Sequence, residues 1–151
     1  MKQKELEIIS HLRKDARSSL AAISNDVEIP ISTIYDKVNR MHKGDVIKRF
    51  TTLVDFSKLG YHHHATIAIR VPKKQKRELF LFLKNENSIN TLHEINNGFD
   101  FLIETIHINI KEYSEFIEEL QESFNILELN KFQIIKEIER ERFNCLLSFQ
   151  T

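Results

Sequence analysis

The chain has 151 residues, of which 41% are hydrophobic and 29% are charged, and its 22 basic and 22 acidic residues give a formal net charge of zero. No apolar run approaches the roughly 20 residues that a membrane-spanning helix needs, so we expect a soluble globular protein with no membrane partner. A single cysteine, Cys145, excludes an internal disulfide framework and a cysteine-rich zinc site, and the N-terminus does not resemble a signal peptide, so the expected location is cytoplasmic.

Two helices are predicted at the start of the chain. Apolar residues between Leu6 and Leu12 line one face of a helix over residues 4–15. A second helix is predicted from Ser19 to Asp26, because the Ser19 hydroxyl can accept a hydrogen bond from a free amide of the first turn. A turn of three or four residues then leads into a third helical pattern.

This third pattern, within residues 29–41, is the most informative segment of the chain. Its apolar residues Ile34, Val38 and Met41 form one stripe, and its opposite face is polar. Two short helices joined by a short turn, the second polar outside, are the layout of a helix-turn-helix. An ordinary amphipathic surface helix is the alternative for the segment taken alone. The residues expected to contact bases and phosphates of double-stranded DNA are Ser32, Thr33, Tyr35, Asp36, Lys37, Asn39 and Arg40.

Charge is distributed unevenly along the chain. Residues 1–60 hold 11 Lys and Arg against 8 Asp and Glu, whereas residues 61–151 hold 11 against 14. Part of the basic excess lies just after the third helix, so Lys48 and Arg49 join the predicted phosphate contacts. So small a positive charge predicts weak DNA binding by one chain. Dimerisation would double the number of these charges. The charge pattern therefore favours a homo-oligomeric DNA-binding protein.

The sequence pattern changes after residue 45. Residues 46–54 are rich in β-branched residues and predict a strand, which is followed by a connector that ends at Gly60. From residue 61 the predicted order is strand, helix, strand, strand, helix, strand, which is a ferredoxin-like βαββαβ module. The expected fold is α+β, with a helix-turn-helix domain at 1–45, a linking strand and connector at 46–60, and a ferredoxin-like domain at 61–151.

No cofactor, metal or catalytic site is predicted. His62 and His64 would share one face of a strand, but no Cys, Asp or Glu lies nearby in the sequence to complete a metal site. Solvated linker histidines are therefore expected, and metal binding by the run is the alternative that the sequence leaves open. No Ser/His/Asp or Cys/His arrangement is evident, and three glycines provide no Gly-rich phosphate loop, so no enzyme is expected.

The order and spacing of these elements resemble the Lrp/AsnC family of transcriptional regulators over nearly the whole chain. The resemblance implies a ferredoxin-like domain of the RAM type, which forms dimers that often assemble into tetramers or octamers and which holds small effectors, frequently amino acids. The matching residues are the helix around Leu6 to Leu12, Asp15-Ala16-Arg17, Ser32-Thr33-Ile34, Val46-Ile47, Leu59-Gly60 and Asn97-Gly98-Phe99-Asp100.

The same resemblance suggests an effector site at the Asn-Gly turn of the second domain. Gly98 permits a tight turn, and Asp100 can accept a hydrogen bond from the ammonium group of an effector or from a neighbouring subunit. A plain Asn-Gly hairpin with an exposed aspartate is the alternative. The candidate effector-binding residues are Asn96, Asn97, Gly98, Phe99 and Asp100.

Three positions depart from the family pattern. Glu28 stands where the turn usually carries Gly, Pro30 stands where a Ser or Thr cap is common, and Lys37 stands where an Arg is common. These changes leave the fold prediction intact but put family-typical base contacts in doubt. They keep open a ligand-sensing module without DNA binding. Sirohaem decarboxylases share a similar layout and form a second alternative, although their His and Arg runs are not found here.

Overall fold

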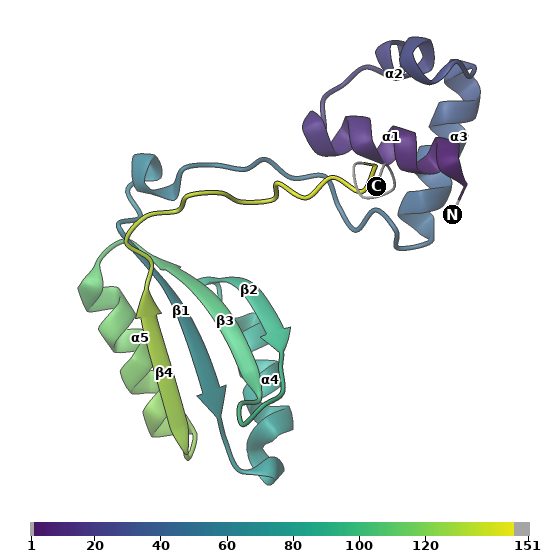
Figure 1. The fold of residues 1–151 in the computed structure, drawn as a ribbon. Coiled ribbons are helices and arrows are strands. Elements are labelled where there is room, and N and C mark those ends of the chain that lie inside the picture. Colours follow the sequence, from purple (N-terminus) through teal and green to yellow (C-terminus); the bar gives the residue numbers. More distant parts are fainter. Residues whose placement is uncertain (1, 147–151) are drawn as a thin grey trace. The chain divides into compact units, whose positions relative to one another are not determined.

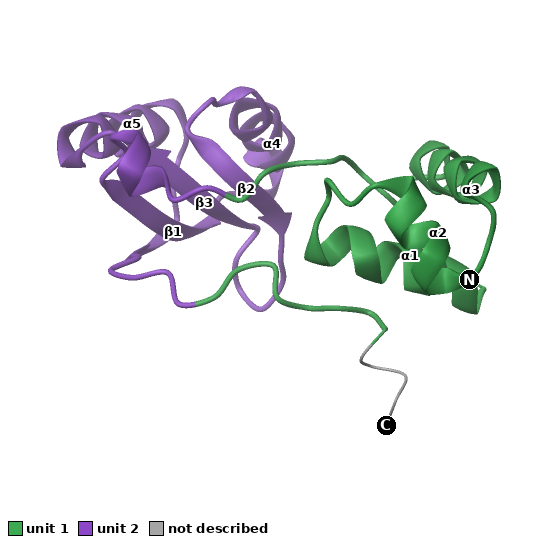
Figure 2. Cartoon of the chain, turned by 90° about the horizontal axis from the view of Figure 1, so that it is seen from above, with its two compact units in different colours: residues 1–53, 139–151 green, residues 54–138 purple. Residues whose placement is uncertain are grey.

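A computed structural model of the chain describes residues 2–146, which form two compact units (Figure 2). Unit 1 combines residues up to 53 with the segment from residue 139 onward, and unit 2 comprises residues 54–138. None of the described helices is long and apolar enough to cross a membrane.

Unit 1 contains the three helices that the sequence predicts, packed around one apolar core (Figure 1). Ser19 caps the second helix as expected, because its Oγ accepts a hydrogen bond from the backbone amide of Ala22 at 3.1 Å. The helices are α1 (Gln3–Lys14), α2 (Leu20–Val27) and α3 (Ile31–Lys43). Their fully buried apolar residues are Ile8, Ile23, Val27, Ile34 and Met41.

The turn between α2 and α3 explains the unusual residues in it. Glu28 has φ 55° and ψ 46°, a left-handed conformation that costs a non-glycine residue about 1 kcal/mol. Ser24 offsets part of this cost, since its Oγ donates a hydrogen bond to the Ile29 carbonyl at 2.6 Å. Pro30 then begins α3 without a side-chain cap. The turn thus keeps the helix-turn-helix geometry although glycine is absent from it.

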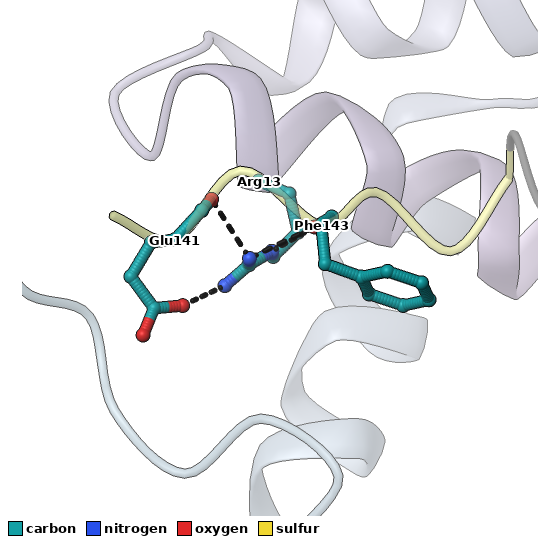
Figure 3. Close-up of polar contacts among 3 residues, drawn as sticks. All are labelled: Arg13, Glu141 and Phe143. Atoms are coloured by element: carbon teal, nitrogen blue, oxygen red, sulfur yellow. Dashed lines mark hydrogen bonds and ion pairs between the residues drawn. The ribbon is translucent and has the colours of Figure 1, made fainter. Parts of the chain in front are cut away.

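The segment that begins at residue 139 belongs to unit 1, and Arg13 of α1 binds it through hydrogen bonds (Figure 3). The Arg13 guanidinium donates to the Glu141 carboxylate at 2.8 Å, to the Glu141 carbonyl at 3.0 Å and to the Phe143 carbonyl at 2.8 Å. The side chain of Asn144 also donates to the Ser10 carbonyl, at 3.4 Å. The sequence analysis expected residues 61–151 to form the second domain, but the described residues 139–146 belong to unit 1. Residues 147–151 lie outside the described part of the chain.

Unit 2 has the predicted ferredoxin-like order of elements. Its four strands form one antiparallel sheet in the order β2-β3-β1-β4. The two strands of each βαβ unit are therefore not neighbours: β3 lies between β1 and β2, and β1 lies between β3 and β4, as in the ferredoxin-like fold. The elements are β1 (His63–Arg70), a 3-10 turn (Lys73–Gln75), α4 (Lys76–Asn85), β2 (Ile89–Glu94), β3 (Phe101–His107), α5 (Ile110–Ser123) and β4 (Glu128–Gln133).

The two faces of this sheet differ in what covers them. On one face Ile67, Ile69 and Ile103 are buried beneath α4 and α5. On the opposite face the alternate positions Thr66 and Glu104, which are paired across β1 and β3, stay partly exposed. Neither helix of the unit covers this second face, which we call the open face.

The linking segment is not a strand. The sequence predicts a strand at 46–54, but residues 48–55 have no regular secondary structure, and a 3-10 turn at Phe56–Leu59 follows them. A strand needs a neighbour to satisfy its backbone amides and carbonyls, and no described strand pairs with this segment. The connector ends at Gly60, as predicted, because this glycine takes a left-handed φ of 92° after the 3-10 turn.

Two buried histidines lie inside unit 2, and for one of them, His63 on β1, the expectation of a solvated linker histidine is wrong. His63 and His107 are 5% and 4% exposed, and both rings pack against Tyr113, at centroid distances of 4.2 and 5.6 Å. Among the described residues, no group makes a hydrogen bond with the Nε2 atom of either ring. Burial lowers the pKa of both histidines, the His64 charge lowers the pKa of His63 further, and the carboxylates of Glu112 and Glu86 partly offset the shift at His107. These rings are therefore held in the neutral form.

We expect the free energy of unfolding to fall as the pH decreases from about 7.5 to about 5.5. The unfolded chain binds protons at these histidines near pH 6.5, above the pKa values of the folded state, so stability that is present above that pH is lost as the pH falls through the folded values. Urea titrations at both pH values measure the loss. His107→Leu should lose less stability than the wild type, and an equal loss would contradict this origin.

Candidate functional site

The outer face of α3 is fixed by what its inner face buries. Ile34 is fully buried and Met41 is 4% exposed, so the helix cannot rotate without exposing apolar surface. Tyr35, next to Ile34, is consequently 57% exposed. Of the predicted DNA-contacting residues, Ser32, Tyr35, Asp36, Arg40, Lys48 and Arg49 are exposed, and Thr33, Lys37 and Asn39 are partly buried.

Exposed and partly exposed polar side chains follow one stripe along α3. Ser32, Asp36 and Asn39 are spaced by four and three residues, which places them on one side of the helix, with Arg40 adjoining at the next turn. Hydroxyl, carboxylate and amide groups read base edges in the major groove, where a carboxylate accepts from the amino group of cytosine. The stripe thus combines three hydrogen-bonding side chains with one cation.

Glu5 of α1, which the sequence does not single out, organises the charges on α3. Its Oε1 lies 3.8 Å from Lys37 Nζ and 3.8 Å from Arg40 Nη2. The Lys37 side chain is only 15% exposed, whereas that of Arg40 is 68% exposed. Lys37 is therefore drawn toward α1, and Arg40 keeps a guanidinium directed to solvent.

The ionisation of Glu5 keeps this arrangement in place. The Lys2 backbone amide donates to Glu5 Oε2 at 3.1 Å and lowers the pKa of that carboxyl, with smaller contributions from Lys37 and Arg40. The carboxylate is charged near neutral pH and attracts both cations. Sequence spacing could not reveal this pairing, because Glu5 and Lys37 lie on different helices.

The Asn-Gly turn of the candidate effector site has the backbone that its sequence predicts. Asn97 and Gly98 take φ values of 64° and 92°, and the turn lies at 95–100 between β2 and β3. Asn96, Asn97 and Gly98 are exposed, whereas Phe99 and Asp100 are partly buried. The turn therefore offers two amide side chains and its backbone to solvent.

Asp100 is engaged within the chain, which differs from the expected exposed acceptor. Its Oδ2 accepts from the backbone amide of Val71 at 2.9 Å, and its own amide donates to the Ile69 carbonyl at 2.8 Å. Lys76, a residue that the sequence analysis missed, has its Nζ 2.5 Å from Glu94 and 4.0 Å from Asp100. The hydrogen bond with Glu94 raises the pKa of Lys76. Asp100 thus joins the turn to the end of β1, beside a lysine ion pair.

Known proteins that resemble this chain are helix-turn-helix transcriptional regulators, both for the N-terminal helices and for most of the chain. The model of the winged helix-turn-helix DNA-binding family matches residues 1–48. The chain is 30% identical to the HTH-type transcriptional regulator FL11 of Pyrococcus furiosus over 112 residues. This match covers 74% of each of the two proteins. The chain is 23% identical over 137 residues to an uncharacterized HTH-type transcriptional regulator of Pyrococcus horikoshii, covering 91% of this chain and 92% of that protein.

Solved structures share the fold. AsnC of E. coli superposes with a TM-score of 0.83 at 16% identity, covering 95% of this chain and 98% of that one. A transcriptional regulator of Neisseria meningitidis, solved as a complex with L-Met, superposes with a TM-score of 0.81 at 15% identity, covering 93% of both chains. At these identities the likeness is one of fold.

Asp100→Ala should destabilise unit 2 by about 1–3 kcal/mol, because it leaves the buried amide of Val71 without its acceptor. Asp100→Asn retains an acceptor oxygen and should lose less. Urea denaturation of both variants measures the difference. Equal midpoints for the wild type and Asp100→Ala would contradict a structural role for this carboxylate.

Proposed function

The chain belongs to the Lrp/AsnC family of helix-turn-helix transcriptional regulators, and we propose that it acts as a homo-oligomer that contacts double-stranded DNA through the outer face of α3 and responds to a small effector. The observation that carries this proposal is the fixed orientation of α3, whose buried Ile34 and Met41 leave the stripe of Ser32, Asp36 and Asn39 outward. In this proposal the chain has a binding role and no catalytic one.

The proposed DNA contacts divide by chemistry. Exposed cations at Arg40, Lys48 and Arg49 suit phosphates, which fix the position of a protein on the duplex. Ser32, Thr33, Tyr35, Asp36 and Asn39 suit base edges in the major groove. Lys37 takes a lesser part, since Glu5 already holds it.

A second copy of the chain is the proposed partner of the open face of unit 2. This face carries Phe132, which is 57% exposed, together with the partly exposed Leu102 and Ile106. Burying such apolar surface against an identical face would form a two-fold interface. A dimer presents two recognition helices and doubles the small positive charge of residues 1–60. Further association of dimers into tetramers or octamers belongs to the same proposal.

The proposed effector is a small polar molecule such as an amino acid. Support comes from the exposed turn at Asn96, Asn97 and Gly98 and from the related fold of the Neisseria regulator, which is complexed with L-Met. Phe99 and Asp100 complete the proposed site, with Asp100 also supporting the turn from within. Because the same unit carries the open face, effector binding could shift the assembly among oligomeric states.

Arg40→Ala should weaken binding to all DNA sequences and reduce the slope of log affinity against log salt by about 0.9 for each Arg40 that contacts a phosphate. Fluorescence anisotropy with duplex DNA at several salt concentrations measures this slope. Lys111→Ala removes the same charge from an 83%-exposed position in unit 2 and should leave the slope unchanged. If the slope of log affinity against log salt is unchanged in Arg40→Ala, Arg40 does not contact a DNA phosphate.

Effector binding should change the size of the assembly. Light scattering of the full chain with and without each amino acid should reveal at least one that shifts the mass, and Asn97→Ala should blunt that shift. A mass unaffected by every amino acid would exclude this class of effector, without bearing on DNA binding.

A further inference from the structure

Three side chains with metal-ligand atoms converge on the open face of unit 2. They are His64 on β1, Glu104 on β3 and Glu137 in the segment that follows β4, and one ligand atom of each lies within 4.8 Å of the other two. His64 and Glu104 are partly buried, and Glu137 is exposed. His64 and Glu104 lie on the face that the function proposed above assigns to a second copy of the chain, but that proposal gives no role to their ligand atoms.

The fold explains why residues so far apart in sequence meet here. In the register of β1 and β3, Thr66 lies opposite Glu104 and His64 opposite Ile106, so His64 and Glu104 are diagonal neighbours on one face. The amide of Ile134 donates to the His64 carbonyl at 2.8 Å, which brings the chain after β4 alongside β1. That contact carries Glu137 to the same corner of the sheet.

Hydrogen bonds hold Glu104 ready to bind a ligand. Its Oε2 accepts from Thr91 Oγ1 at 2.7 Å and from Asn90 Nδ2 at 2.9 Å, while its Oε1 lies 2.5 Å from His64 Nε2. Outer partners of this kind orient the first ligands of metal sites in proteins. The His64 and Glu104 side chains are only 20% and 19% exposed, so both are held in a restricted environment.

We propose that His64, Glu104 and Glu137 bind a divalent transition-metal ion of the Zn²⁺ type. One imidazole nitrogen and two carboxylates suit Zn²⁺ and its neighbours, whereas Ca²⁺ and Mg²⁺ prefer oxygen ligands alone. Three protein ligands leave a fourth position for water or another small ligand. The ion neutralises the two carboxylates and takes the place of any proton on His64 Nε2.

The geometry needs only small adjustments to accept the ion. Ligand atoms at about 2.1 Å from a tetrahedral metal are about 3.4 Å apart, so the 2.5 Å contact between His64 and Glu104 opens by about 0.9 Å. A ligand oxygen of Glu137, which is exposed, already lies within 4.8 Å of the ligand atoms of His64 and Glu104. All three ligands come from one chain, so binding does not require the dimer. The sequence missed this site because no carboxylate lies close to the His62–His64 run along the chain.

Zn²⁺ titration of the full chain by calorimetry tests the proposal. One ion per chain should bind, and Glu104→Gln and His64→Gln should each weaken binding by at least tenfold. Glu137→Gln alters an exposed side chain, so it tests the site with little risk to folding. His62→Gln, at the exposed neighbouring histidine, is the matched control and should bind as the wild type does.

Three results would overturn the site. The first is no Zn²⁺ binding by the wild type under conditions where circular dichroism shows it folded. The second is a loss in His62→Gln as large as that in His64→Gln, which would mean that the histidine run itself chelates the metal. Tighter binding of Mg²⁺ than of Zn²⁺ would likewise contradict the proposed role of the imidazole. DNA affinity measured on the same samples keeps this test separate from the proposed DNA contacts.

Discussion

The burial of one side of α3 against α1 and α2 is the constraint on which the function of this chain depends. Ile34 is fully buried at the centre of unit 1, and Met41 extends the same contact by two turns. Removing a buried side chain of this size from a core typically costs 2–5 kcal/mol, about the scale of a small domain's stability. The helix is therefore held in one rotational setting, and the direction of its polar residues follows from that setting rather than from their own interactions.

Positive charge on the outer face of α3 is limited by the same packing. Glu5 reaches α3 from α1 and draws Lys37 inward, so the exposed Lys and Arg side chains of the helix are Arg40 and Lys43. A monomer with so little free positive charge would bind DNA weakly, because each neutralised phosphate contributes only a modest increment. In the proposed homo-oligomer a second chain would double this positive charge, while each of the two units keeps its own core.

The elements that local patterns specify could be predicted from the sequence. The helix around Ile34 and the capping role of Ser19 follow from spacing within a few residues, and both are confirmed. Contacts between distant residues could not be predicted: Arg13 binding the segment at Glu141, and Asp100 binding the amide of Val71, leave no periodic signal. The predicted linking strand fails for a related reason. Strand propensity is local, whereas a pairing partner must come from elsewhere in the structure.

Hydroxyl-radical footprinting read by mass spectrometry tests the orientation of α3 on DNA most directly. Tyr35 is 57% exposed on the outer face of α3, and Tyr61, which is 42% exposed, lies outside that helix and provides an internal reference. With saturating duplex DNA, oxidation of Tyr35 should fall severalfold while that of Tyr61 stays constant. Retention of full Tyr35 reactivity in the DNA complex would contradict the account.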